Sequence, residues 1–367
     1  MSDYKATATI AFPGLAAYLD TIVASLASHN LDVQAEADGH RIRSPFGRAW
    51  LRAGPAALHL AVEASDPAGF NRMKHDLTGL IDFVARPEGL QIAWTGDETG
   101  ATLPPDLRVL TVRNVRQLTP FMRRITLAGQ DLDRYAVPDQ IHCRLLFPSG
   151  QTGAPEWPRL GDDGRIVWPP SGKLASRIYT IRRIDPTGGT LDIDFALHPG
   201  SGPGVDWARA AAPGDIVGIV GPAAHGPKPA DWYLLAGDET GLPGIARILE
   251  ALPASARGVA LIEVAGAAEE QPLAAPGGVE VRWLHRGEAA PGTAPLLIDE
   301  VRSLELPADR SRMLFWGGSE FDTYRSIRNH LVRDAGVPAS RVVAYSHWRR
   351  GMSEEDIVEA GAAAITP

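Results

Sequence analysis

The hydrophobic pattern of this chain changes its period near Pro222, and this change limits the folds that the chain can adopt. Before Pro222, short apolar segments alternate with turns rich in Gly, Pro and Asp, a pattern typical of a β-barrel. After it, apolar strands alternate with segments whose apolar residues recur at helical spacing, such as Ile245 and Leu249. Strands that alternate with helices form a doubly wound parallel sheet. We therefore predict an α+β multidomain chain with an antiparallel β-barrel over 107–225 and a doubly wound α/β domain over 230–351.

The predicted strands of the barrel begin at Arg108. The apolar segments expected to form it read RVLTVRNV, RRITLAG, HCRLLFPSG, GRIVWPP, SRIYTIRRI, TLDIDFALH and DIVGIVGP. In the α/β domain, the predicted strands are DWYLLAGD, VALIEVAG, VEVRWLHR, RMLFWGGSE and RVVAYSHW. Helices are predicted over 245–252 and from Tyr324 to a stop near Gly336.

Residues 1–97 are predicted to form a separate small α+β domain. YKATATIAF has the alternation of a strand, apolar residues recur at helical spacing over 15–26 and 70–81, and Asp38-Gly39 is a hairpin signal. LQIAW is expected to close this domain before a polar linker, TGDETGATLPPD. No cluster of convergent polar residues stands out, so a docking or stabilising role is favoured. The Glu- and Ala-rich tail over 352–367 is compatible with a helix and has no readable role.

Composition excludes several classes of function. The formal net charge of −8 argues against nucleic acid as a partner, because phosphate binding needs a basic surface. Cys143 is the only cysteine, which excludes intrachain disulfides and cysteine-ligated iron–sulfur clusters. The histidines include no pair at HxH or HxxxH spacing, so no metal site is expected. No apolar run reaches the roughly 18 residues of a membrane span and no signal peptide is recognisable, so we expect a cytoplasmic protein.

The most informative local motif is RIYTIR at 177–182. Arg177 and Tyr179 lie two residues apart on a predicted strand, so their side chains share one face and can contact one planar ligand. Thr180 can add a hydroxyl or a backbone group at the rim of that ligand. Farther along, Gly202-Pro203-Gly204 is a turn that opens a short helix, and free amides at a helix start suit a pyrophosphate. Alone, each segment would be an ordinary strand or loop, whereas together they can hold both ends of a dinucleotide.

A second motif, Gly237-Asp238-Glu239-Thr240-Gly241, follows an apolar strand and precedes a predicted helix. Open α/β sheets bind ligands beyond the carboxyl ends of their strands, and this turn lies at such an end. The same turn is compatible with a simple strand-to-helix connection in which Thr240 is the N-cap. It lacks the GxGxxG pattern, so the pattern alone does not propose a nucleotide.

These segments occur in the order seen in a known family. From about Leu107 to about Gly351, the chain resembles the siderophore-interacting proteins, flavin-dependent ferric-siderophore reductases of the ferredoxin-reductase-like group. The similarity includes HPGSGPGVDWA at 198–208, WGGSEFDTYRSIRNHL and AYSHWRRG. Residues 1–97 resemble a small domain of unknown function that also occurs as a free-standing protein. The resemblance implies an FAD-binding barrel, a nicotinamide-binding α/β domain and a substrate between them.

The resemblance also implies which residues contact the two cofactors. They are Arg177, Tyr179, Thr180, His198, Gly202, Gly204, Val205, Trp207, Ala208, Gly237, Asp238, Glu239, Thr240, Gly317, Glu320 and Trp348, the last of which has a core or surface tryptophan as its alternative role. The family usually has Ala and Ser where this chain has Gly204 and Val205, so one hydroxyl contact to the pyrophosphate is lost. Asp206 would repel a diphosphate unless its carboxylate points away.

Nucleotide and substrate preferences follow from the charged residues. The segment AGAAEEQ after the strand ALIEV offers acidic groups and no cation for a 2′-phosphate, so NADH is favoured over NADPH. Substrate contacts are expected at Arg144 on a barrel strand and at Arg349, which otherwise faces solvent. The family has a further basic residue where this chain has Ala223, and His225 or Lys228 is expected to substitute for it.

The function implied by the resemblance is hydride transfer from NADH to FAD, followed by single-electron transfer to a ferric siderophore and release of ferrous iron in the cytoplasm. No paired-carboxylate or Ser/His/Asp constellation is present, and this chemistry needs none. Two alternatives remain open. The acceptor can be another molecule, such as a quinone or free flavin, or the chain can be a non-catalytic flavin- or siderophore-binding module, which the change at Gly204 and Val205 supports. A monomer is compatible with the sequence, which does not determine the oligomeric state.

Overall fold

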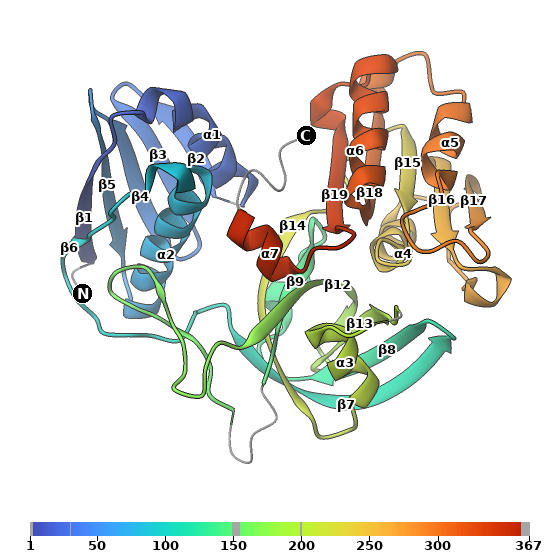
Figure 1. Ribbon diagram of the computed structural model, residues 1–367, viewed down its shortest axis with the longest axis horizontal. Coiled ribbons are helices and arrows are strands. Elements are labelled where there is room, and N and C mark those ends of the chain that lie inside the picture. The colour runs from blue at the N-terminus through green and yellow to red at the C-terminus, as the bar shows by residue number, and fades with distance from the viewer. Residues whose placement is uncertain (1–2, 30, 149–154, 199, 361–367) are drawn as a thin grey trace. The chain divides into compact units, whose positions relative to one another are not determined.

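The structure is a computed structural model that describes residues 3–29, 31–148, 155–198 and 200–360 (Figure 1). The chain divides into two compact units. The first contains 1–107, 148–175 and 357–366, and the second contains 108–147 and 176–356. The first unit is therefore discontinuous in sequence, because a segment between two barrel strands belongs to it.

The first unit is built on a six-stranded antiparallel sheet in the order β2-β3-β4-β5-β1-β6 (Figure 1). Its elements are β1 (Tyr4–Ala11), α1 (Leu15–Ser28), β2 (Asp32–Glu36), β3 (Gly39–Ser44), β4 (Gly47–Ala53), β5 (Ala57–Ala64), α2 (Pro67–Val84) and β6 (Thr95–Gly96). Alternate strand residues such as Ala8 and Leu60 are buried, and they pack with Ile22 and Phe70 of the helices in one core. The pairing of β2 with β3 confirms the hairpin predicted at Asp38-Gly39.

Two segments of the first unit differ from the sequence-based prediction. GRIVWPP forms no barrel strand, because Ile166–Val167 (β11) pairs with Arg159–Leu160 (β10) in a separate two-stranded sheet. The predicted linker is not wholly irregular, because it supplies β6, whose Gly96 pairs with Ala6 of β1. The error at GRIVWPP arises because a short apolar run carries no period that separates a barrel strand from an inserted hairpin.

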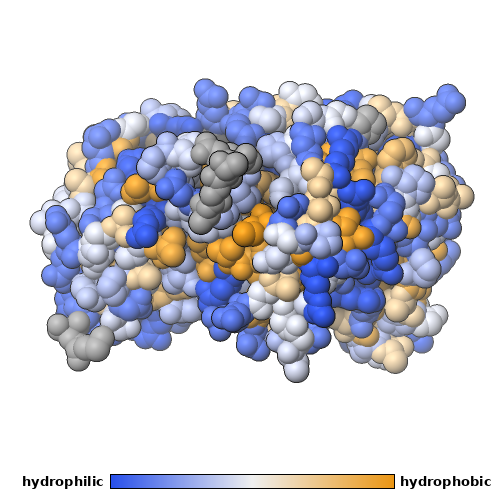
Figure 2. Space-filling model, turned by 90° about the horizontal axis from the view of Figure 1, so that it is seen from below, coloured by the Kyte–Doolittle hydropathy of each residue, from blue (hydrophilic) through white to orange (hydrophobic). Residues whose placement is uncertain are grey.

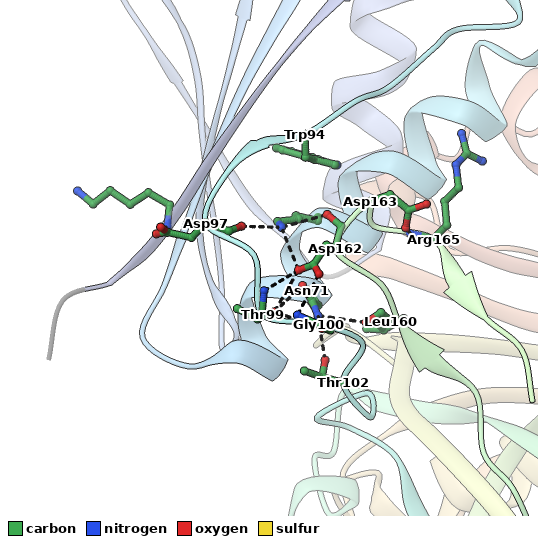
Figure 3. Close-up of polar contacts among 12 residues, drawn as sticks. Asn71, Trp94, Asp97, Thr99, Gly100, Thr102, Leu160, Asp162, Asp163 and Arg165 are labelled. Carbon is green, nitrogen blue, oxygen red and sulfur yellow. Dashed lines mark hydrogen bonds and ion pairs between the residues drawn. The ribbon is translucent and has the colours of Figure 1, made fainter.

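Residues 148–175, which lie between two barrel strands in the sequence, form the inserted segment of the first unit. Figure 3 shows the polar contacts that join this segment to α2 and to the predicted linker. Lys74 of α2 is 1% exposed, and its ammonium donates to the Asp162 carbonyl at 3.0 Å and lies 4.0 Å from the centroid of the Phe70 ring. The Asp162 carboxylate accepts the N–H groups of Thr99 and Gly100 at 2.7 and 2.9 Å. Burial lowers the pKa of Lys74. The predicted linker is therefore part of a fixed polar network.

A chain that lacks residues 1–97 is expected to keep a folded barrel and α/β domain but to leave the insertion without its partners. Limited trypsin digestion with mass spectrometry should then cut after Arg159 or Arg165 in the truncated chain and spare these bonds in the full chain. A matched variant, in which a short Gly/Ser linker also replaces 149–174, should resist the protease. Rapid cleavage within 176–356 in this second variant would show that the barrel and the α/β domain depend on the first 97 residues.

The second unit begins with a closed barrel of six strands in the order β12-β13-β8-β7-β14-β9, which confirms the predicted barrel. Its elements are β7 (Arg108–Thr119), β8 (Met122–Ala128), β9 (Gln140–Phe147), β12 (Ala175–Asp185), β13 (Thr190–Ala196), α3 (Pro203–Ala210) and β14 (Ile216–His225). Inward-facing residues of the strands, among them Leu110, Ile125, Leu145 and Ile193, fill the interior. The short helix α3 follows the turn at Gly202, as the sequence predicted.

A five-stranded parallel sheet in the order β17-β16-β15-β18-β19 completes the second unit and confirms the predicted α/β domain. Its elements are β15 (Trp232–Gly237), α4 (Leu242–Ala251), β16 (Arg257–Val264), β17 (Gly278–His285), α5 (Leu296–Ser303), β18 (Met313–Glu320), α6 (Phe321–Asn329) and β19 (Val342–Trp348). A further helix, α7 (Glu354–Ala360), begins in the second unit, and its residues from 357 onward belong to the first. The strand order reverses between β15 and β18, so the carboxyl ends of these two strands define the crevice where such sheets bind ligands. The sequence did not predict α5, because so short a helix shows little more than two turns of periodicity.

Buried contacts hold the barrel against the parallel sheet within the second unit. Arg182 of β12 is 5% exposed and forms two hydrogen bonds with the Glu250 carboxylate of α4, at 2.8 and 2.6 Å. These hydrogen bonds lower the pKa of Glu250 to about 2. Apolar side chains of the barrel, Met122 and Ile141, belong to the same core as Trp316 of β18. One hydrophobic core therefore contains side chains of both the barrel and the sheet, and it fixes the barrel strands relative to the strand ends of the sheet.

The face of the molecule in Figure 2 is mainly polar, with apolar side chains between the polar ones. The large apolar side chains that are exposed are Leu103, Val109, Phe121, Ile166, Val167 and Ile178. Among the helices of the described residues, none combines the length and the apolar character that a membrane span requires.

Candidate functional site

The side chains of Arg177 and Tyr179 lie on one face of β12, as the sequence predicted from their spacing. The Tyr179 ring packs against Phe195 with centroids 4.4 Å apart and against Phe147 at 6.5 Å. Burial raises the pKa of the Tyr179 phenol, so the ring is neutral over the physiological range. Thr180 is buried. The strand therefore presents a guanidinium and a fixed aromatic ring beside each other.

The start of α3 is in close contact with the Tyr179 hydroxyl. A Cβ atom on Gly204 would stand 2.1 Å from that hydroxyl oxygen, so glycine is required for this close approach. Gly202 precedes the helix, and no side chain caps its first turn. The Trp207 ring packs against Phe147 at 5.5 Å, and Val205 and Ala208 are buried. The helix start thus has uncapped amides next to Tyr179, which suits an anion.

Asp206, which would repel a diphosphate if it pointed toward one, lies in the first turn of α3 and is bound by the loop that precedes this helix. Its carboxylate accepts the Ser201 hydroxyl at 2.5 Å and the Gly202 N–H at 3.0 Å, and it lies 3.6 Å from the Arg209 guanidinium. The Ser201 hydrogen bond is the main reason that the pKa of Asp206 is lowered. His198 is exposed, and its carbonyl accepts a hydrogen bond from Arg209 at 2.7 Å. Arg209 therefore compensates the carboxylate and fixes the loop.

A second group of predicted residues converges at the carboxyl ends of β15, β18 and β19. The Asp238 carboxylate, which is 4% exposed, accepts the Trp348 indole N–H at 2.9 Å, the Glu320 N–H at 3.1 Å and the Thr240 N–H at 2.9 Å. A Cβ on Gly237 would lie 2.7 Å from the Gly318 carbonyl, so the two strand ends approach closely. These contacts bring together Asp238, Thr240 and Glu320, which the resemblance assigned to the nucleotide, and Trp348, which it placed near the flavin.

Thr240 is not the helix cap that a simple strand-to-helix connection would make it, whereas Glu320 is itself a helix cap. Gly241, not Thr240, is the N-cap of α4, and the Thr240 hydroxyl donates instead to Asp238 at 2.5 Å. Glu320 caps α6 by accepting the Asp322 N–H at 2.6 Å. The Arg349 guanidinium lies 4.4 Å from the ring centroid of Phe321, the first residue of α6. The turn is therefore held by side chains rather than by helix capping alone.

An arginine that the sequence analysis did not assign to the site lies at the same edge. Arg286 follows β17, and its guanidinium forms an ion pair with Glu239 and lies 3.9 Å from Glu263. Burial raises the pKa of Glu239, and burial together with the nearby Asp238 carboxylate raises that of Glu263 to about 7. The register of β16 with β17 brings Arg286 to this position, which the segment directly after β16 does not reveal.

Two imidazoles link the barrel strand β9 to the sheet strand β19. The rings of His142 and His347 meet edge to face with centroids 5.5 Å apart, and His142 stacks on Trp316 at 6.3 Å. Burial lowers the pKa of both, that of His142 to about 3, so both rings are neutral near pH 7. The His347 Nδ1 lies 3.2 Å from the Thr240 hydroxyl oxygen. The pair therefore fixes β9 next to the edge of the sheet that the carboxyl ends of its strands form.

Arg144 shares a face of β9 with His142, two residues away. Its guanidinium donates to the Ser176 hydroxyl at 3.0 Å and forms an ion pair with Glu354 at the start of α7. The Arg177 guanidinium donates to both carboxylate oxygens of Glu355, at 2.7 and 2.9 Å. Residues 354–360 of the tail, whose role could not be read from the sequence, thus form a helix, and its first two residues pair with the two predicted arginines.

Two further predicted substrate residues, His225 and Lys228, belong to the end of β14 and the loop after it. His225 ends β14, and its side chain lies outside what the structure describes. Lys228 is exposed in the following loop, and its ammonium forms no hydrogen bond or ion pair with any described residue. Within the described ranges, no group of three or more His, Cys, Asp or Glu side chains is placed to hold a metal ion.

Comparisons with known proteins match nearly the whole chain. The family model for siderophore-interacting protein matches residues 230–351, and that for the siderophore-interacting FAD-binding domain matches 111–226. A model described as an uncharacterized protein conserved in bacteria matches 7–95.

Individual proteins are similar over about two thirds of the chain. A ferric vibriobactin reductase of Vibrio cholerae is 30% identical over 253 residues, which cover 68% of this chain and 91% of the relative. An NADPH-dependent ferric-chelate reductase of Escherichia coli is 30% identical, with coverages of 66% and 92%. Among solved structures, a siderophore utilization protein from T. fusca is 39% identical with a TM-score of 0.60, and the match covers 72% of this chain and 98% of that one. A siderophore-interacting protein from Aeromonas hydrophila is 34% identical with a TM-score of 0.60, covering 70% and 97%.

Proposed function

This chain belongs to the siderophore-interacting protein family, and we propose that it is a flavin-dependent reductase that transfers electrons from a nicotinamide dinucleotide through FAD to a ferric siderophore. Relatives named as a ferric vibriobactin reductase and a ferric-chelate reductase support a reductase. The observation that carries the proposal is the arrangement of Arg177 and Tyr179 beside the uncapped start of α3.

The residues of this arrangement fit FAD. The uncapped amides of α3 can receive a diphosphate, and Arg177, which is paired with Glu355, places a guanidinium on the neighbouring strand. The neutral ring of Tyr179 is held by Phe195 and offers an edge for a planar ring system. Gly204 leaves room for the Tyr179 hydroxyl, so the departure from the family's alanine fits this ring position. When bound, FAD would supply a group that accepts a hydride and passes on single electrons.

The dinucleotide that reduces the flavin would bind at the carboxyl ends of β15 and β18. NADH is the proposed donor, because Arg286, a cation at this edge of the sheet, is held in a buried ion pair by Glu239 and lies close to Glu263. A 2′-phosphate would have to compete with these carboxylates for the guanidinium. The Escherichia coli relative is named as NADPH-dependent, so the preference needs direct measurement in this chain.

The proposed substrate is a ferric siderophore that approaches near Arg144 of β9 and Arg349 after β19. One-electron reduction gives the ferrous complex, which holds its chelator less tightly than the ferric one does. Iron would then leave the chelator, and we place this step in the cytoplasm. No acid or base residue is needed for the electron transfer itself, so the protein's part is to bind and orient the reactants.

Absorbance spectroscopy of the purified protein tests this function. Protein loaded with FAD should be yellow, lose its colour when NADH is added without oxygen, and regain it when a ferric siderophore is added. Reduction by NADH should be faster than by NADPH at equal concentrations. Colour that returns with a quinone but not with any ferric chelate would indicate another acceptor. A flavin that neither nucleotide bleaches would indicate a non-catalytic binding module.

A further inference from the structure

The first turn of α7 is fixed in place by a reciprocal cap. The Ser353 N–H and hydroxyl each donate to the Asp356 carboxylate at 2.7 Å, and the Asp356 N–H donates back to the Ser353 hydroxyl at 3.1 Å. This capping box satisfies the free amides at the helix start. Glu354 and Glu355 lie between the two capping residues, so the cap determines where their carboxylates extend.

Both carboxylates bind the arginines of the proposed reductase site. Glu355 forms a two-point contact with Arg177, while Glu354 pairs with Arg144 and lies 4.0 Å from the Arg177 Nε. These two guanidinium groups and two carboxylates together carry no net charge. Ala223, opposite His142 on the neighbouring strand β14, adds no cation.

These pairs contribute little to the stability of the fold, because they are partly exposed to solvent. The side chain of Glu355 is 52% exposed and that of Arg144 is 39% exposed. Exposed ion pairs are screened by water and salt. Their principal effect is electrostatic: they remove the positive potential that the two arginines would otherwise present to an approaching ligand.

We propose that Glu354 and Glu355 are specificity-determining residues that cancel the charge of Arg144 and Arg177 and so disfavour ferric chelates of high negative charge. The inference rests on the proposed function, since it concerns the substrate of that site. Three dianionic catecholates around a ferric ion leave a triply negative complex, whereas three hydroxamates leave a neutral one. A neutral cluster gives no attraction to the first and imposes no penalty on the second. The expected substrate class is therefore neutral, hydroxamate-type ferric chelates.

The test uses the full-length chain loaded with FAD and two probes, a hexadentate ferric tris-catecholate and a hexadentate neutral ferric trihydroxamate. Binding of each probe is measured by quenching of tryptophan fluorescence, and reoxidation of the reduced flavin by each probe is measured in a stopped-flow instrument. The variants are Glu354→Gln, Glu355→Gln and the double substitution. The matched control is Glu359→Gln, which removes one charge from the same helix but does not touch either arginine.

In the double variant, affinity for the catecholate relative to the hydroxamate should rise about tenfold at low ionic strength, and salt should suppress this gain. Glu359→Gln should leave the ratio unchanged. An equal change for both probes, or a change no larger than that of the control, would overturn the proposal. If neither probe reoxidises the flavin of the unmodified protein, the proposed function is wrong, but the binding ratio still decides whether the two glutamates select by charge.

Discussion

Replacing Asp194 with alanine is expected to lower the free energy of unfolding of the second unit by about 3–5 kcal/mol. Asp194 lies on β13 opposite Arg124 of β8, and its carboxylate accepts two hydrogen bonds from that guanidinium, at 2.6 and 2.8 Å. The side chains of Asp194 and Arg124 are only 3% and 11% exposed. Removing the carboxylate leaves a buried guanidinium without its counter-charge, and Arg182, 4.0 Å from Asp194, loses part of its compensation as well.

Urea unfolding followed by tryptophan fluorescence measures this loss. Asp192→Ala is the matched control, because Asp192 lies two residues away on the same face of β13 and accepts a hydrogen bond from the neutral Thr126 hydroxyl at 2.7 Å. The control should cost only about 1 kcal/mol. Replacing both partners, as Arg124→Met with Asp194→Leu, should restore much of the stability, because the isolated charge is then gone. Equal losses for Asp192→Ala and Asp194→Ala would contradict a buried-charge origin.

The sequence predicted the parts of the fold that have a local period. Strands and helices alternate after Pro222, and the parallel sheet follows from that alternation. GRIVWPP is not a barrel strand, because its Ile166–Val167 pairs with the two-residue strand Arg159–Leu160. Strands this short show no period in the sequence. Lys74 belongs to a helix that the sequence predicted, but its ammonium is buried against a segment 88 residues away. Such long-range polar contacts leave no pattern in the local sequence.

The candidate site also combines residues that a local pattern predicts with contacts that no local pattern predicts. Arg177 and Tyr179 were identified because a spacing of two residues defines a face of a strand. The partner of Arg177, Glu355, is 178 residues away, so no local pattern connects them. The spacing of Ser353 and Asp356 resembles a capping box and was a usable signal for the start of a helix. It did not reveal what the two glutamates between them contact, which depends on the packing of α7 against the barrel strands.

Arg177→Ala is expected to weaken FAD binding by roughly 10- to 100-fold, since a charge-assisted hydrogen bond is typically worth about 1.5–3 kcal/mol. Arg177 is the cation on the face of β12 that also carries Tyr179, next to the uncapped start of α3. Its loss would also release Glu355 as an uncompensated carboxylate close to the expected diphosphate. Both effects act in the same direction, against an anionic cofactor.

Flavin retained after gel filtration and the dissociation constant from flavin fluorescence measure this effect. Arg183→Ala is the matched control: Arg183 lies on the same strand, but its side chain is 58% exposed and pairs with Glu250, away from Tyr179. Arg177→Lys should bind FAD with intermediate affinity, because lysine keeps the charge but not the two-point geometry. Adding Glu355→Gln to Arg177→Ala should recover part of the loss if the released carboxylate contributes to it. A folded Arg177→Ala protein that retains all of its FAD would exclude this arginine from the flavin site, and the uncapped amides of α3 would then have to bind the phosphates without it.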